Sequence, residues 1–304
     1  MKILITDGIA PEGMKILNDA GYEIDQKKLT PDELVRVIGG YDCIIVRSAT
    51  NVTKDVVAAG KNLKAIARAG IGVDNIDSKA AEQHGIPVLS TPGASAISVA
   101  ELAIGHMLSV SRFLNISTLE MRQGKWPKQE YEIGVEVYKK TLGIIGFGNI
   151  GKEIARRALG MGMQVLAYDP AVASTDLAVE LTSRERLLKD SDYITIHIPY
   201  DKKRGPAIGR QEFDQMKAGV ILINCARGGV VDEKALLEAL NSGKVQGAAL
   251  DVFMNEPPTD AQRELFHHPR VGVSPHIGGQ TIEAQSRIAI EIAHKVVTTL
   301  SPGK

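Results

Sequence analysis

Short apolar runs alternate with helical patterns along almost the whole chain, and this alternation limits the possible folds more than any other feature. In the N-terminal third, residues 2–6, 43–47 and 63–68 form such runs, and helical patterns that end at glycine separate them. The runs are continuously apolar, which is typical of parallel strands that are buried on both faces. The sequence therefore predicts βαβ units and an α/β fold.

A second alternating series begins near residue 142 and contains six predicted strands. These strands span residues 142–145, 164–168, 193–198, 220–225, 247–252 and 271–274. Six parallel strands with helices between them are typical of a doubly wound dinucleotide-binding sheet with strand order 3-2-1-4-5-6. An apolar helix is predicted over residues 98–121, and a last helix over residues 281–300 is expected to cross back onto the first domain.

We therefore predict two doubly wound parallel-sheet domains, which agrees with a length of 304 residues at about 150 residues per domain. A flavodoxin-like substrate domain is expected to comprise residues 1–93 and 283–304. A Rossmann dinucleotide-binding domain is expected to comprise residues 94–282.

The composition excludes several classes of function. Lys plus Arg and Asp plus Glu both number 36, so the formal net charge is zero, and no basic surface for nucleic acid or membranes is expected. No stretch of about 18 uncharged apolar residues is present to span a membrane. The two cysteines, Cys43 and Cys225, lie in separate apolar runs and predict neither a disulfide framework nor a metal site. A reducing, cytoplasmic compartment is expected.

Residues 146–151 read Gly-Phe-Gly-Asn-Ile-Gly and match the G-x-G-x-x-G pattern. A chance match is possible in a chain with 30 glycines, but a predicted strand precedes this one and a helical pattern follows it. An aspartate, Asp169, ends the next strand about 20 residues on, where it can bind both ribose hydroxyls and repel a 2′-phosphate. This segment therefore predicts an NAD site. Its residues are Gly146, Gly148, Asn149, Ile150, Gly151 and Asp169.

Three functional side chains follow three consecutive predicted strands, at the sheet edge where ligands bind in such folds. Arg227 can clamp a carboxylate or polarise a carbonyl, and His276 can take and return the hydroxyl proton. Glu256 can orient the imidazole and stabilise its charged form. Taken singly, they could be a surface charge, a loop histidine and an acid at a helix start, but together they suit hydride transfer with a 2-hydroxy acid.

The chain resembles the D-isomer-specific 2-hydroxyacid dehydrogenase family, and within it the D-3-phosphoglycerate dehydrogenases most closely. The resemblance rests on residues 46–50, 68–75 and 98–102, the turn at 146–151 and the three segments around Arg227, Glu256 and His276. It implies that these three are the catalytic residues and that NAD is the cofactor. The further cofactor-binding residues that it implies are Ile71, Ile198, Cys225, Ala226, Asp251, Gly278 and Gly279.

The substrate prediction depends on Arg47 and Arg68, which each follow or end an apolar strand of the first domain. Two guanidiniums match the oxygens of a phosphate dianion, and the backbone of Gly70 and Gly72 could bind a carboxylate. The alternative is that an arginine pairs with a nearby acid. The resemblance implies NAD-dependent oxidation of 3-phospho-D-glycerate to 3-phosphohydroxypyruvate, the first step of L-serine biosynthesis.

Other members of the family leave the substrate open. The alternatives are glyoxylate or hydroxypyruvate reduction, D-lactate or erythronate-4-phosphate dehydrogenation, and an NAD-sensing, corepressor-like role. Two segments depart from the family pattern, at residues 93–96 and at the charged loop 201–205. The chain ends at Lys304, so a short form without a C-terminal regulatory domain is expected. The apolar helix and the irregular arm at residues 124–140 predict a homodimer.

Overall fold

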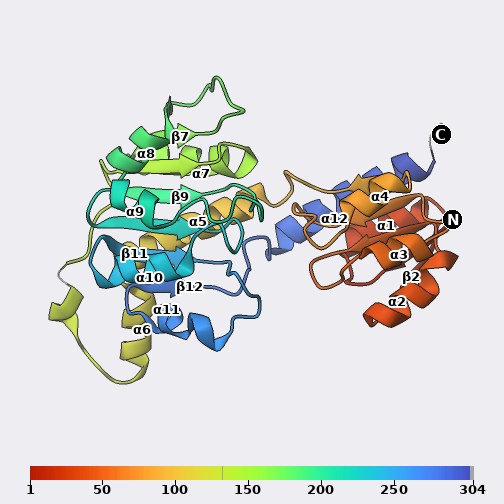
Figure 1. Ribbon diagram of the computed structural model, residues 1–304, viewed down its shortest axis with the longest axis horizontal. Helices are drawn as coiled ribbons and strands as arrows, with labels where there is room; N and C mark the ends of the chain where they lie inside the picture. Colours follow the sequence, from red (N-terminus) through yellow and green to blue (C-terminus); the bar gives the residue numbers. More distant parts are fainter. Residues whose placement is uncertain (132, 302–304) are drawn as a thin grey trace. The chain divides into compact units, whose positions relative to one another are not determined.

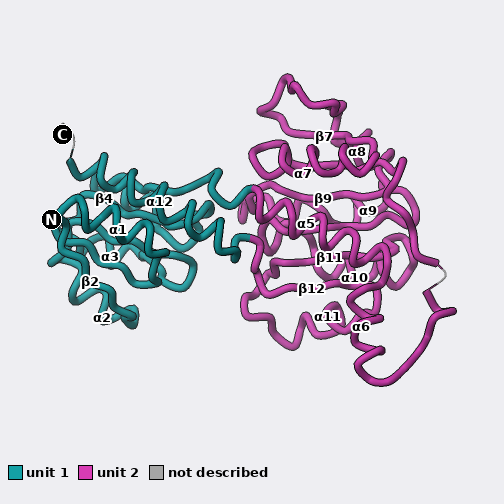
Figure 2. The backbone as a smooth tube through the Cα atoms, turned by 180° about the vertical axis from the view of Figure 1, so that it is seen from behind, with its two compact units in different colours: residues 1–96, 279–304 teal, residues 97–278 magenta. Residues whose placement is uncertain are grey.

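Two separate parallel sheets organise the chain, one in each of two units (Figure 2). The computed structural model describes residues 1–131 and 133–301. Unit 1 comprises residues 1–96 and 279–304, and unit 2 comprises residues 97–278. The sequence placed the two boundaries a few residues away, after residues 93 and 282.

The sheet of unit 1 has five parallel strands in the order β2-β1-β3-β4-β5, which is the flavodoxin-like order. Its strands are β1 (Lys2–Ile5), β2 (Glu23–Gln26), β3 (Cys43–Val46), β4 (Ala65–Arg68) and β5 (Val88–Leu89). Its helices are α1 (Pro11–Asp19), α2 (Pro31–Val37), η1 (Ile38–Gly40), α3 (Lys54–Ala59), α4 (Ser78–Gln83) and α12 (Ile282–Leu300).

Strand β3 shows why the first sheet needs helices on both faces. Cys43 and Ile45 point into a core that α1 and α12 cover, while Ile44 and Val46 point into the core under α2, α3 and α4. Successive strand residues alternate between faces, so a continuously apolar run requires two cores. Helix α12 begins after Thr281, whose hydroxyl caps it, and packs against α1 of the same unit (Figure 1).

The sheet of unit 2 has seven parallel strands in the order β12-β11-β10-β9-β6-β7-β8. Its strands are β6 (Thr141–Ile145), β7 (Gln164–Tyr168), β8 (Glu180–Leu181), β9 (Tyr193–Ile196), β10 (Val220–Asn224), β11 (Val245–Leu250) and β12 (Val271–Val273). Its helices are α5 (Ala96–Ser111), α6 (Leu114–Arg122), η2 (Lys128–Tyr131), α7 (Asn149–Gly160), α8 (Arg184–Asp190), α9 (Arg210–Gln215), α10 (Glu233–Asn241), η3 (Asp260–Gln262) and α11 (Arg263–His267).

The prediction of six strands in this sheet was wrong, because β8 was missed. A strand of two residues is too short to appear as an apolar run in the sequence. The strand predicted third is β9, which is the fourth in chain order and pairs directly with β6. The strands β10, β11 and β12 are nevertheless neighbours. The three loops predicted to carry the catalytic residues therefore follow adjacent strands.

The single helix predicted over residues 98–121 was also wrong, because the chain breaks it into α5 and α6. Phe113 lies at the break with φ 56°, a left-handed conformation that ends α5. The periodicity did not reveal this break, because apolar residues continue into α6. No single helix among the described residues is long and apolar enough to cross a membrane. The pair α5 and α6 meets that criterion only together, with a bend of 66°.

Candidate active site

The turn between β6 and α7 leaves its backbone open on one side and tightly packed on the other. Gly146 has φ 94°, and a Cβ there would lie 2.4 Å from the carbonyl oxygen of His197. A Cβ on Gly151 would lie 2.3 Å from the carbonyl oxygen of Gly146, so only glycine lets helix and strand approach this closely. Gly148 is the N-cap residue of α7, where no side chain caps the helix, and a Cβ there would meet no atom within 4 Å. The positive end of α7 can therefore receive a pyrophosphate.

Asp169 follows β7 and lies beside this turn. Its Oδ2 accepts a hydrogen bond of 2.9 Å from the backbone N–H of Phe147, and its Oδ1 accepts one of 2.9 Å from Ala171. A carboxylate has about four acceptor sites, so two remain for ribose hydroxyls. Ile198 borders the same turn, because its Cγ2 would lie 2.9 Å from a Cβ on Gly146. These residues fit the adenosine diphosphate half of NAD.

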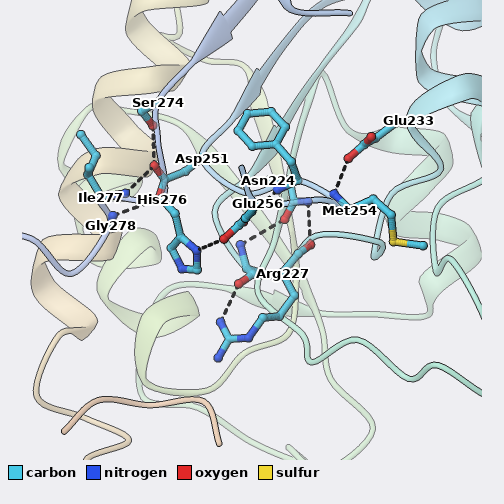
Figure 3. A network of polar contacts seen from close by, with 12 residues as sticks. Asn224, Arg227, Glu233, Asp251, Met254, Glu256, Ser274, His276, Ile277 and Gly278 are labelled. Atoms are coloured by element: carbon cyan, nitrogen blue, oxygen red, sulfur yellow. Dashed lines mark hydrogen bonds and ion pairs between the residues drawn. The ribbon is translucent and has the colours of Figure 1, made fainter. Parts of the chain in front are cut away.

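A histidine and a glutamate are in contact at the ends of two neighbouring strands (Figure 3). The Nδ1 of His276, after β12, lies 2.6 Å from the Oε2 of Glu256, after β11. Oε1 of Glu256 accepts a hydrogen bond of 3.0 Å from the backbone N–H of Phe253. Burial acts to raise the pKa of Glu256, but the bonds from His276 and Phe253, together with the charge of Arg227, lower it overall. The carboxylate is therefore held ionised against the imidazole.

Arg227 lies in the loop after β10, where Asn224 fixes the backbone. The side chain of Asn224 accepts a hydrogen bond of 3.0 Å from Ala226 N–H and donates one of 3.1 Å to the carbonyl of Arg227. The guanidinium of Arg227 donates to the carbonyl of Ala226 at 2.7 Å. Burial raises the pKa of the neighbouring Cys225 thiol, so this cysteine packs as an uncharged side chain. Asn224 was missed from the sequence because its role depends on backbone geometry.

The loop after β12 is held by a buried aspartate. Asp251 is 1% exposed, and its carboxylate accepts hydrogen bonds from the backbone N–H groups of Ile277 at 2.9 Å and Gly278 at 2.8 Å. Ser274 also donates to it. Ser274 was missed in the sequence, as was His106, which contacts it. A single histidine within the apolar helix was the only signal that could have indicated His106.

In unit 1, Arg47 and Arg68 lie at the same edge of the sheet. Val46 pairs with Arg68 across β3 and β4, and Arg47 follows immediately. The guanidinium of Arg47 donates to Oε1 of Gln280 at 3.2 Å and makes no ion pair with any described residue. Asp42, an acid near Arg47 in the sequence, instead pairs with Lys64 at 2.8 Å.

Glycine makes room for the second arginine. A Cβ on Gly70 would lie 1.3 Å from Nη1 of Arg68, which also donates to the carbonyl of Ala69 at 3.1 Å. The roles predicted for Gly72, Ile71 and Gly279, which also belong to unit 1, stay predictions.

Nucleotide-binding and proton-transferring groups thus share one sheet in unit 2, which is the arrangement of a dehydrogenase that uses a nicotinamide dinucleotide. Residues 104–278 match the NAD-binding domain of the D-isomer specific 2-hydroxyacid dehydrogenases, and the chain belongs to that family. This result confirms the predicted family, enzyme class and cofactor: the protein is an NAD-dependent D-2-hydroxyacid dehydrogenase.

The relatives of this chain are named after different substrates. The chain is 48% identical over 301 residues to the hydroxypyruvate reductase of Thermotoga maritima, with 98% of both chains covered. It is 42% identical over 304 residues to the D-3-phosphoglycerate dehydrogenase of Methanocaldococcus jannaschii, covering 99% of this chain and 57% of that one. The chain thus spans little more than half the length of that relative.

A solved structure shares the fold over nearly the full length. The D-lactate dehydrogenase of Aquifex aeolicus, complexed with NAD and lactic acid, is 29% identical and has a TM-score of 0.87. The similarity covers 98% of this chain and 95% of that one. The predicted fold class, α/β with two doubly wound parallel sheets, is confirmed.

Proposed function

We propose that the protein oxidises 3-phospho-D-glycerate to 3-phosphohydroxypyruvate with NAD. The observation that carries this proposal is the guanidinium of Arg47, which has no carboxylate partner among the described residues and follows a strand beside that of Arg68. Two guanidiniums at one sheet edge suit the three oxygens of a phosphate group, because each can donate two parallel hydrogen bonds.

The proposed chemistry assigns a separate task to each side chain of unit 2. Glu256 occupies Nδ1 of His276, so Nε2 is the nitrogen that takes the hydroxyl proton from the substrate. Arg227 holds the carboxylate or the oxygen on the reacting carbon. NAD, when bound, accepts the hydride from that carbon. The products are the 2-keto acid, NADH and the proton that His276 passes to water.

The proposal is tested by measuring NADH oxidation with phosphohydroxypyruvate and with hydroxypyruvate. We expect Arg47→Gln to raise the KM for the phosphorylated substrate about 10- to 100-fold, because a charge-assisted hydrogen bond contributes about 1.5–3 kcal/mol. The same variant should leave the KM for hydroxypyruvate within about 2-fold. Arg36→Gln, which removes an exposed arginine from α2 in the same unit, is the matched control.

Reduction of hydroxypyruvate is a second candidate function, and the 48% identity to the Thermotoga maritima hydroxypyruvate reductase over nearly the full length of both chains favours it. The same assay separates the two. A wild-type enzyme that prefers hydroxypyruvate, together with an Arg47→Gln variant that changes neither KM, would replace the first proposal by the second.

We further propose a homodimer formed through α6 and the arm that follows it. Leu114, Leu119 and Met121 of α6 are each at least half exposed, and Trp126 in the arm is 76% exposed. Apolar side chains gathered on one exposed segment are typical of a protein interface. Light scattering of Trp126→Ser against the wild type tests this assembly. The two cysteines are free and buried, and the reducing compartment predicted from the sequence stays a prediction.

A further inference from the structure

Helix α5 carries a histidine that connects to the loop of His276 through two other side chains. The Nε2 of His106 lies 2.8 Å from Oγ of Ser274, and Ser274 donates to Oδ1 of Asp251 at 2.5 Å. His106 is 9% exposed and Asp251 is 1% exposed. The three side chains therefore form a continuous hydrogen-bonded line from α5 to the loop after β12, with both ends buried and Ser274 half-buried between them.

The hydrogens on Ser274 and His106 decide which residue donates in each hydrogen bond of this line. Ser274 has one hydroxyl hydrogen, which it donates to Asp251, so Nε2 of His106 must carry the hydrogen of the other bond. Burial lowers the pKa of His106 and favours the neutral ring. His106 is therefore a neutral donor that holds the Ser274 hydroxyl in the rotamer that points at Asp251.

Asp251 depends on such donors, because it makes no ion pair with lysine or arginine among the described residues. Three donors reach its carboxylate: Ser274 and the N–H of Ile277 at Oδ1, and the N–H of Gly278 at Oδ2 (Figure 3). Hydrogen bonds of this kind stabilise a buried carboxylate in its charged form. Removing one of them weakens the hold of Asp251 on the other two.

The loop that Asp251 holds has an unfavourable backbone conformation at His276. His276 has φ 52°, a left-handed conformation that is unfavourable for a residue with a Cβ. Its N–H donates to the carbonyl of Asp251 at 2.8 Å. Asp251 thus binds residues 276–278 through both its main chain and its side chain, and those bonds maintain the position of the His276 ring.

We propose that His106 is a positioning residue for the reaction, acting through Ser274 and Asp251 on the loop that carries His276. It touches neither substrate nor cofactor in this role. It fixes the hydroxyl of Ser274, which completes the set of donors around Asp251, and that set keeps the imidazole of His276 directed at Glu256.

The test measures NADH oxidation with whichever 2-keto acid the wild-type enzyme turns over fastest, so it does not depend on the proposed substrate. We expect His106→Phe to lower kcat about 10-fold and to leave the KM for NADH within about 3-fold, because the turn at β6 holds the other half of the cofactor. His106→Gln should recover most of kcat, because its side-chain amide can donate to Ser274. His106→Asn, which is too short to reach Ser274, should behave like His106→Phe.

A double-mutant cycle of His106→Phe and Ser274→Ala tests whether the two residues act on kcat through one another or independently. If His106 acts through Ser274, the double variant loses no more kcat than Ser274→Ala alone. Multiplied losses would overturn the proposal. If His106→Phe fails to fold, His106→Asn takes its place in the cycle.

The control is Ser111→Ala, which removes another buried hydroxyl of α5, one that contacts the Tyr193 hydroxyl at 3.0 Å. It should lower Tm and leave kcat unchanged. A loss of Tm without loss of kcat in both His106→Phe and His106→Asn would show that His106 is only structural, and would also overturn the proposal.

Discussion

Nδ1 of His276 lies 2.6 Å from Oε2 of Glu256, although the two residues are 20 positions apart and follow different strands. Glu256 accepts a second hydrogen bond from the Phe253 backbone, so its carboxylate is anchored before it meets the imidazole. The contact leaves Nε2 as the nitrogen available for proton transfer. The histidine therefore has a fixed tautomer and a supporting negative charge before substrate arrives.

Replacing either member of this pair should reduce turnover strongly. We expect His276→Asn to lower kcat about 10²- to 10⁴-fold, the usual contribution of a general acid–base group, and Glu256→Gln to lower it less. Stopped-flow measurement of NADH oxidation gives kcat, and NADH fluorescence gives the cofactor affinity, which should stay within about 3-fold. His267→Gln, a change at the end of α11, is the control. Retention of kcat in His276→Asn would contradict the assigned role.

Adding a methyl group inside the phosphate-binding turn should separate helix from strand. The Cβ of Gly151→Ala would lie 2.3 Å from the carbonyl oxygen of Gly146, so α7 must move away from β6. We expect a lower Tm and a KM for NADH raised about 10-fold or more. Gly160→Ala, at the other end of the same helix, meets no atom within 4 Å and should retain both values. Equal behaviour of the two variants would contradict the packing argument.

Removing the charge of Asp169 should change the choice of cofactor. Asp169→Asn keeps one acceptor oxygen but no longer repels a 2′-phosphate. We expect kcat/KM to rise about 10-fold with NADPH and to fall with NADH, since the ribose hydroxyls lose a charged acceptor. Parallel assays with the two reduced cofactors measure the ratio. An unchanged preference for NADH would mean that other groups select the cofactor.

The free energy of unfolding should decrease as the pH is lowered below about 6.5, the usual pKa of histidine. His197 is one of the residues responsible. Nε2 of His197 contacts the hydroxyl of Thr195 at 2.7 Å, and its buried Nδ1 has no partner among the described residues. Burial lowers the pKa of His197 to about 3. Between these two values the unfolded chain binds a proton that the native ring does not, so acid favours unfolding.

The effect is checked by urea unfolding of the wild type and His197→Gln at several pH values between 7 and 5. One such proton corresponds to a slope of up to about 1.4 kcal/mol per pH unit below 6.5, and the variant should lose that part of the slope. A remaining slope is expected, because burial lowers the pKa of His106 and His268 as well. Identical slopes in the two proteins would show that His197 is protonated in the folded state.

Much of the candidate site could be predicted from local sequence. The turn at residues 146–151 needs only a strand, three glycines and a helix in order, and each of these is visible in one short segment. The grouping of Arg227, Glu256 and His276 follows from parallel strands ending at one edge. The count of strands was wrong by one, yet the grouping survived, because β10, β11 and β12 remain neighbours.

The features that the sequence did not reveal depend on contacts between distant residues. His106 and Ser274 are 168 positions apart, and nothing in either segment indicates that they touch. The break at Phe113 depends on one left-handed residue within a continuous apolar pattern. Arg47 contacts Gln280 and pairs with no carboxylate among the described residues, whereas the nearby Asp42 pairs with Lys64, and the sequence indicates neither partner.

The amino-acid sequence by itself determined the two parallel sheets and the glycine turn after β6, and it predicted the three side chains to which we assign the reaction. These depend on periodicity and on local order along the chain, which the residues encode directly. Only the tertiary structure decided which nitrogen of His276 is occupied, which donors surround Asp251 and which partner Asp42 takes. Those properties depend on distances of a few ångströms between separate segments, and packing alone sets such distances.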